Sequence, residues 1–267
     1  MPPASPDQPP EAPMTPTPLS ARPAPVHRLL DPVIRRILDR IDIRPDQSVL
    51  EVGAGPGEIT AHLAHLVGDH GIVTAVDTDT SRLSPTNVID VQQRDLDRDV
   101  LPDTYDRYDH VVARRSTQPL RDPVDVLEQM IARLRPGGWL LLADILPSAP
   151  KVYRAPDAVD DHLIAAVMNR VRRAIAGSDE AGTWTSNIES LLVNRGMTRH
   201  CVHVGTETWT GTRPGCQLLA DIATHLRPEL ATEFSDSDLD RFGALMADPR
   251  VLLASYTTRV IHAREAD

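Results

Sequence analysis

A glycine-rich segment follows a strand-like run near the start of the sequence and holds its most informative residues. Gly53, Gly55 and Gly57 stand between the apolar run Ser48–Val52 and a helical pattern that begins at Glu58. Glycine lets the chain turn sharply, and the free amides at a helix N-terminus can approach a ligand closely. The spacing therefore predicts a ligand-binding loop between a strand and a helix.

The same spacing differs from the dinucleotide fingerprint. That fingerprint requires a third glycine at the position of Glu58, whereas the third glycine here comes one residue earlier, at Gly57. Glu51 adds a carboxylate at the end of the strand, which is unfavourable beside a diphosphate and favourable beside a cation. The segment thus favours a cationic ligand and disfavours a nicotinamide-dependent oxidoreductase.

Strand and helix patterns alternate from this segment to residue 145, as in βαβ units around a parallel sheet. The expected strands are Ser48–Val52, Ile72–Val76, Val88–Gln92, Asp109–Ala113 and Trp139–Ile145. The expected helices are Leu29–Ile41, Glu58–Leu66, a short helix after Val76, and Val124–Leu134. The last strand is apolar without alternation, which is typical of a strand covered on both faces.

The second half of the chain is richer in helices. The expected helices are Asp157–Ala176, Ser186–Asn194, Cys216–Leu226 and one that opens at Ser235. Cys201–Thr210 and Leu252–Ala263 are expected to form a late antiparallel pair of strands. The insertion Thr212–Asp248 between them must bury its apolar stripes, either over the ligand cleft or against a second copy of the chain in a homodimer.

A series of landmarks resembles the class I S-adenosylmethionine-dependent methyltransferases, and the overall pattern is similar to their actinobacterial small-molecule members. The matching segments, in order, are Glu51–Gly57, Val73–Asp77, Gln93–Leu96, Tyr108–Arg114 and Leu134–Trp139. The resemblance covers Leu30–Ile145. It implies an α/β, Rossmann-like, doubly wound sheet of seven strands in the order 3-2-1-4-5-7-6, with the last strand antiparallel. It also implies a domain over residues 26–267, in which helices at about 157–177 and 213–248 form a cap or bind the acceptor.

The resemblance further implies a set of cofactor-binding residues: Glu51, Gly53, Ala54, Gly55, Asp77, Thr78, Asp95, Leu96 and Arg114. Glu51 would lie near the ammonium of S-adenosyl-L-methionine, and Asp77 would accept hydrogen bonds from both ribose hydroxyls. Asp95 would accept one from the adenine amino group, and Arg114 would lie where cofactor and acceptor meet. The alternatives are structural: a strand-end cap for Asp77, a solvated charge run for Asp95 and a surface ion pair for Arg114.

The implied reaction is an in-line transfer of the methyl group, which leaves S-adenosyl-L-homocysteine and requires no metal. An acceptor hydroxyl would benefit from a general base, but the sequence identifies no catalytic residue. Asp144 at the end of the fifth expected strand and His162 in a late helix are the two candidates, and both also fit ordinary surface positions. Tyr153, Trp184 and Trp209 either line an acceptor pocket or fill the core.

Composition limits the partners. The chain has 267 residues, a net charge of −10 and 24 prolines, and its first 25 residues form a proline-rich leader that we expect to be disordered. The acidic charge argues against nucleic acid, and no apolar run is long enough for a membrane span. With only Cys201 and Cys216, we expect reduced thiols, no metal site and a cytoplasmic location.

We therefore expect methylation of O, N or C in a small molecule, hypothetically a specialised metabolite. The alternative is a protein that binds the same cofactor for cyclisation or sensing, without methyl transfer.

Overall fold

The computed structural model describes residues 27–103, 107–114, 120–146, 148–176 and 183–266. The predicted leader over residues 1–25 lies outside these ranges, and so does the side chain of Trp184. Among the described helices, none is long and apolar enough to cross a membrane.

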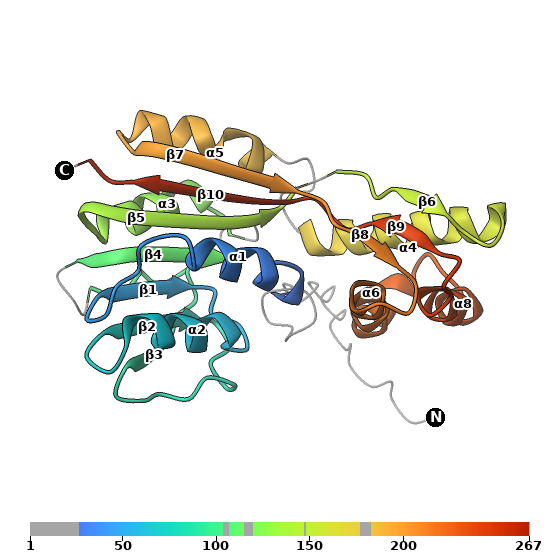
Figure 1. Cartoon of the computed structure of the whole chain (residues 1–267), viewed down its shortest axis with the longest axis horizontal. Helices are drawn as coiled ribbons and strands as arrows, with labels where there is room; N and C mark the ends of the chain where they lie inside the picture. The colour runs from blue at the N-terminus through green and yellow to red at the C-terminus, as the bar shows by residue number, and fades with distance from the viewer. Residues whose placement is uncertain (1–26, 104–106, 115–119, 147, 177–182, 267) are drawn as a thin grey trace, which may run out of the picture.

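A seven-stranded sheet forms the body of the protein (Figure 1), with the order β3-β2-β1-β4-β5-β10-β7. Its strands are β1 (Ser48–Val52), β2 (Ile72–Asp77), β3 (Ile89–Gln93), β4 (Tyr108–Arg114), β5 (Leu134–Ile145), β7 (Thr198–Gly205) and β10 (Thr258–Arg264). Strands β1 to β5 are parallel, whereas β10 is antiparallel to both β5 and β7. Since β7 and β10 are the sixth and seventh strands of this sheet along the chain, the predicted order 3-2-1-4-5-7-6 with an antiparallel last strand is confirmed.

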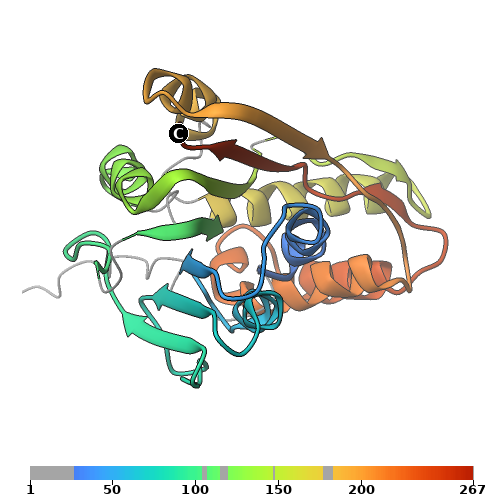
Figure 2. The same cartoon turned by 60° about the vertical axis from the view of Figure 1, so that its left-hand side comes forward.

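Helices cover both faces of the sheet, because successive strand residues point to opposite sides. The short 3-10 turn η2 (His27–Leu29), α1 (Asp31–Leu38) and α2 (Glu58–Val67) lie on the face that includes Val49. Helices α3 (Pro123–Ala132) and α5 (Thr183–Asn194) lie on the face that includes Leu50. Figure 2 shows the two layers on either side of the sheet.

A smaller lobe lies beyond the carboxyl ends of the parallel strands (Figure 1). It contains a three-stranded sheet of order β6-β9-β8 and four helices. The elements are β6 (Val152–Arg154), α4 (Ala158–Ala176), β8 (Thr208–Thr210), α6 (Pro214–His225), α7 (Arg227–Leu230), α8 (Asp236–Met246) and β9 (Leu252–Ala254). One apolar cluster runs from Ile34 in α1 through Ile164 in α4 to Leu219 in α6 and Phe242 in α8, so the lobe shares its core with the large sheet.

The late strands differ from the prediction. Each predicted strand is divided in two, because the chain passes from the large sheet into the small one between β7 and β8 and again between β9 and β10. The two crossings are bonded to each other: the Glu207 amide donates to Ser255 Oγ at 2.8 Å, and the Ser255 amide donates to the Glu207 carbonyl at 2.7 Å.

The predicted short helix after Val76 was wrong. Residues 78–88 form turns and bends instead of a helix. The Asp77 carboxylate accepts the Asp79 amide, and the Asp79 carboxylate accepts the Ser81 amide, both at 3.0 Å. Such local bonds compete with the backbone bonds of a helix.

Candidate functional site

The glycine loop turns tightly between β1 and α2. Gly53, Gly55 and Gly57 all have positive φ angles, of 78°, 57° and 93°. A Cβ atom at Gly57 would lie 2.9 Å from the Leu83 side chain, so this turn requires glycine. The amides of Gly53 and Ala54 donate to the Val76 carbonyl at 2.9 and 3.1 Å, which fixes the loop at the end of β2.

The carboxylate of Asp77 holds the same loop from the end of β2. Its Oδ2 accepts the Gly55 amide at 2.8 Å, and its Oδ1 accepts the Asp79 amide at 3.0 Å and the Thr78 hydroxyl at 3.3 Å. Each carboxylate oxygen has two acceptor positions, so half-buried Asp77 retains capacity for a ligand hydroxyl. The structure therefore places Asp77, the residue predicted to accept hydrogen bonds from the ribose, against the glycine loop.

Glu51 is a buried carboxyl group with one unpaired oxygen. The side chain lies on β1, where the residue is only 1% exposed, and its Oε2 accepts a 2.6 Å hydrogen bond from the Thr60 hydroxyl. Its Oε1 is enclosed and has no hydrogen-bond partner among the described residues. Burial raises the pKa of Glu51 to about 7, although the nearby Arg114 guanidinium opposes the rise. An enclosed acidic oxygen of this kind fits the ammonium group of the implied cofactor.

Arg114 joins the end of β4 to both the glycine loop and α1. The guanidinium is almost fully buried, donates to the Ala54 carbonyl at 2.7 Å and forms an ion pair with Asp31. Burial raises the pKa of Asp31, whereas Arg114 acts in the opposite direction. The surface ion pair considered for Arg114 is thus a buried one, and it places the N-terminal helix beside the loop.

Sequence reasoning missed Asp31. An acidic residue in the first turn of a helix is expected for the helix dipole alone, so its type and position gave no separate signal.

Asp95 and Leu96 follow β3 and have local contacts. The Asp95 Oδ1 accepts the Asp97 amide at 3.2 Å, and its carboxylate lies 3.5 Å from the Arg98 guanidinium. Leu96 packs against the apolar cluster on the α3 side of the sheet. The carboxylate of Asp95 therefore stabilises its own turn, and its predicted contact with adenine stays a prediction.

The two candidate bases have other contacts. Asp144 is buried at the end of β5, and its carboxylate is 3.8 Å from Arg259, which also contacts Glu189 at 3.2 Å. His162 is exposed on α4, with its Nδ1 2.6 Å from the Ala158 carbonyl oxygen. The structure brings neither of them to the cavity described next.

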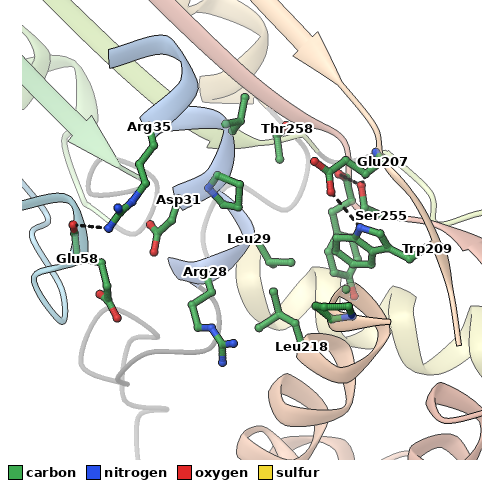
Figure 3. Close-up of a pocket in the computed structure, with 15 residues that line it drawn as sticks. Arg28, Leu29, Asp31, Arg35, Glu58, Glu207, Trp209, Leu218, Ser255 and Thr258 are labelled. Atoms are coloured by element: carbon green, nitrogen blue, oxygen red, sulfur yellow. Dashed lines mark hydrogen bonds between the residues drawn. The ribbon is translucent and has the colours of Figure 1, made fainter. Parts of the chain in front are cut away.

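A cavity of about 420 Å³ opens between α1, the start of α2, β8 and α6. Figure 3 shows Asp31, Arg35 and Glu58 on one side of it, and Glu207 and Trp209 on the other. Arg35 donates to the Glu58 carbonyl at 2.8 Å, and the Trp209 indole donates to Glu207 at 3.0 Å.

Two lining residues give the cavity its chemical character. Glu58 Oε2 is buried without a hydrogen-bond partner among the described residues. Asp31 both lines the cavity and pairs with Arg114, so the cavity begins next to the glycine loop. Of the three aromatic residues noted in the sequence, Trp209 lines the cavity, whereas Tyr153 is exposed below the Lys151 ammonium.

The order of the sheet, the glycine loop and the acids that end β1 and β2 define a class I methyltransferase fold with a site for S-adenosyl-L-methionine. A family described as a methyltransferase domain matches residues 24–208, which is more than half of the chain. The chain belongs to this family of S-adenosylmethionine-dependent methyltransferases.

Curated relatives match only part of the chain. The ubiquinone/menaquinone biosynthesis C-methyltransferase UbiE of Vibrio campbellii is 32% identical over 151 residues, which are 52% of this chain and 56% of that protein. UbiE of Cronobacter sakazakii is 26% identical over 178 residues, or 63% and 67% of the two chains. The aligned region thus spans little more than half of the Vibrio relative.

Solved structures support the fold. A putative methyltransferase from Bacillus halodurans has a TM-score of 0.55 at 17% identity and covers 87% of this chain and 98% of its own. A cyclopropane-fatty-acyl-phospholipid synthase-like protein from Lactobacillus casei has a TM-score of 0.51 at 18% identity, with 90% of each chain covered.

Proposed function

We propose that this protein transfers the methyl group of S-adenosyl-L-methionine to a small molecule bound in the cavity between α1 and α6. The observation that carries the proposal is the position of Asp31, which lines this cavity and pairs with the arginine that contacts the glycine loop. An acceptor in the cavity would lie next to the cofactor site. A volume of about 420 Å³ also lies in the range of small-molecule pockets, which is about 300–1,000 Å³.

The residues of the site fit the cofactor chemically. Glu51 Oε1 would accept from the ammonium, Asp77 from the ribose, and the turned glycine loop would pack against the chain between them. When bound, the cofactor supplies an electrophilic methyl group on a sulfonium. The protein then has to align the acceptor with that group and exclude water.

Glu58 is the group in the cavity that we expect to hold the acceptor. Its unpaired, buried Oε2 would accept a hydrogen bond or a proton from an acceptor hydroxyl or amine. Glu58 is the first residue of α2, immediately after the loop, so the acceptor atom would be held close to the bound methyl group.

The wall of the cavity bears on the class of acceptor. The family match ends at residue 208, whereas Trp209 and α6, which form one wall of the cavity, come after it. The quinone precursors that the name of the UbiE relatives indicates are therefore one set of acceptors to test. Specialised metabolites are the set that we favour, because the wall that contacts the acceptor is outside the family match.

A turnover screen tests this function. The protein is incubated with methyl-deuterated S-adenosyl-L-methionine and a panel of aromatic, quinol and amine metabolites, and products are examined by mass spectrometry for a labelled methyl group. Labelled product supports methyl transfer. Product formed equally well with S-adenosyl-L-homocysteine would support the alternative, in which the cofactor has no methyl-donating role.

Matched variants locate the acceptor. Leu218→Trp fills the cavity from α6 and should raise the KM for the acceptor without changing cofactor affinity. Val193→Trp, on the exposed surface of α5, is the control and should change neither. Equal behaviour of the two variants would place the acceptor elsewhere.

A further inference from the structure

Three potential metal ligands lie close together on β7 and β10, the two strands at one edge of the large sheet. Cys201 and His203 lie two residues apart on β7, and His262 lies directly opposite Cys201 on β10. Side chains at these positions share one face, because residues i and i+2 point the same way and paired residues point together. All three side chains are half-buried.

This face is opposite to the one that α5 covers. Ile261 and Ala263, which flank His262, pack in the cluster that contains Ile188 of α5. His262 therefore points away from α5, and its ring centroid lies 5.3 Å from that of Trp139 and 5.7 Å from that of His203. Figure 1 shows β7 and β10 side by side at the border of the sheet.

The distances suit a tetrahedral ion. Cys201 Sγ and His203 Nε2 are 3.3 Å apart, and one ligand atom from each of the three residues falls within 4.8 Å of the others. Zinc bonds of about 2.3 Å to sulfur and 2.0–2.1 Å to nitrogen place tetrahedral ligand atoms roughly 3.3–3.6 Å apart. One pair already has this separation, and rotation of the His262 side chain would bring the third ligand closer.

His262 also has an unsatisfied ring nitrogen. Its Nδ1 is buried and has no hydrogen-bond partner among the residues that the structure describes. A buried polar atom without a partner costs about 1–3 kcal/mol. An ion that binds to the His262 ring would remove that cost or fix the orientation of the ring.

We propose that Cys201, His203 and His262 bind one zinc-type divalent cation at this sheet edge, outside the methyl-transfer site. A thiolate and two imidazoles form a borderline-soft set that suits Zn²⁺, and the fourth position would be open to water. Binding converts the Cys201 thiol to a thiolate, and its proton is released to solvent. The ion would fasten the edge strand β7 to β10.

The sequence did not indicate this site because its ligands are about 60 positions apart. Cys201 and His203 alone form a short pair, and only the antiparallel register of β7 and β10 adds His262. The expectation of no metal site was based on the two cysteines alone, which are few and isolated in the sequence.

Cobalt provides the direct test, because a tetrahedral Co²⁺ site with a thiolate ligand has visible bands and a near-ultraviolet sulfur-to-metal band. The full chain, freed of any purification tag and kept reduced, is titrated with Co²⁺ and then with Zn²⁺. We expect one equivalent of Co²⁺ to bind with both bands, and Zn²⁺ to displace it. Zn²⁺ should also raise the Tm of the protein.

Four variants decide which residues bind. Loss of an outer partner of a metal ligand already costs about 10–100-fold in affinity, so Cys201→Ser and His262→Ala should each weaken Co²⁺ binding at least about tenfold. Cys216→Ser, at the buried thiol on α6, and His70→Ala, at an exposed histidine, should bind as the unaltered protein does. The proposal is overturned if Co²⁺ does not bind, if the sulfur band persists in Cys201→Ser, or if all variants bind alike.

Discussion

The Glu51 carboxyl group should make cofactor binding depend on pH. Its pKa of about 7 in the free protein means that it is largely protonated at pH 5 and largely ionised at pH 7.5. The cofactor ammonium favours the ionised form, so binding should expel the proton. We expect nearly one proton to be released per cofactor bound at pH 6, and a net uptake of about half a proton at pH 8, where the ligand amine must gain a proton to bind.

The size of the effect follows from the two titrations. The ionised fraction of a group with a pKa of about 7 rises from about 0.01 at pH 5 to about 0.76 at pH 7.5. The α-amino group of the ligand, with an ordinary pKa of about 7.8, is still about two-thirds protonated at the higher pH. Affinity should follow the product of two fractions, that of ionised Glu51 and that of protonated ligand amine. This product predicts that affinity rises about 50-fold from pH 5 to pH 7.5 and declines above pH 8.

Calorimetry with S-adenosyl-L-homocysteine measures both quantities, because this ligand carries the same ammonium. Titrations in buffers with different ionisation enthalpies give the number of protons released. Glu51→Gln keeps an acceptor for the Thr60 hydroxyl but removes the charge, so it should weaken binding at pH 7.5 by about 1.5–3 kcal/mol and flatten the profile below pH 7.

Glu265→Gln is the matched control. Burial also raises the pKa of Glu265, but this residue follows β10 and its amide bonds to Gly138, at the other end of the strands from the glycine loop. Its substitution should leave the pH profile unchanged. Affinity that varies less than about threefold between pH 5 and 7.5, or an unaltered slope in Glu51→Gln, would refute the reasoning.

Four further changes test the rest of the site and the core. Asp77→Ala removes the acceptor beside the loop and should weaken S-adenosyl-L-homocysteine binding by about 1.5–3 kcal/mol; unchanged affinity in a folded variant would exclude a role in ribose binding. Asp31→Asn leaves the Arg114 guanidinium buried without its counter-charge and should lower the free energy of unfolding in urea by about 3–5 kcal/mol, and a loss below 1 kcal/mol would contradict a buried ion pair. Burial lowers the pKa of His110 to about 4, so the unfolded chain binds more protons below pH 6.5; this residue should cost about 2 kcal/mol of stability between pH 7.5 and 5, and His110→Gln should remove that part of the pH dependence. Gly57→Ala places a Cβ against Leu83 at positive φ and should cost about 1–3 kcal/mol in the same urea assay, whereas a neutral effect would show that the loop can relax.

Local pattern and family resemblance were sufficient for the large sheet. The apolar run Trp139–Ile145 belongs to β5, which is covered on both faces, and the glycines after β1 form the tight turn that their spacing indicated. These features depend on neighbouring residues, so periodicity and residue type carry the information. The division of the late strands does not depend on neighbouring residues. Strands β8 and β9 are separated in sequence by the whole of α6–α8 and pair only in the folded chain.

The site shows the same distinction. Glu51 and Asp77 lie at or near the carboxyl ends of β1 and β2 and were identified by position, whereas Asp31 required the contact between α1 and β4. Asp144 was chosen because it lies at the end of β5. Its partner Arg259 comes from β10, which is far from β5 in the sequence. Residues whose role depends on a distant element have no local signal, and this explains both the missed Asp31 and the choice of Asp144.

The paired crossings between the two sheets limit how the small lobe can move. The segments that leave β7 and enter β10 are linked by backbone and side-chain bonds between Glu207 and Ser255, and both residues line the cavity. A swing of the small lobe would have to bend two connected strands together, which is mechanically stiffer than rotation about a single linker. Entry to the cavity should therefore depend on side-chain motion at its mouth. Selection among acceptors should depend on how well they fit a preformed cavity, more than on closure of the small lobe around them.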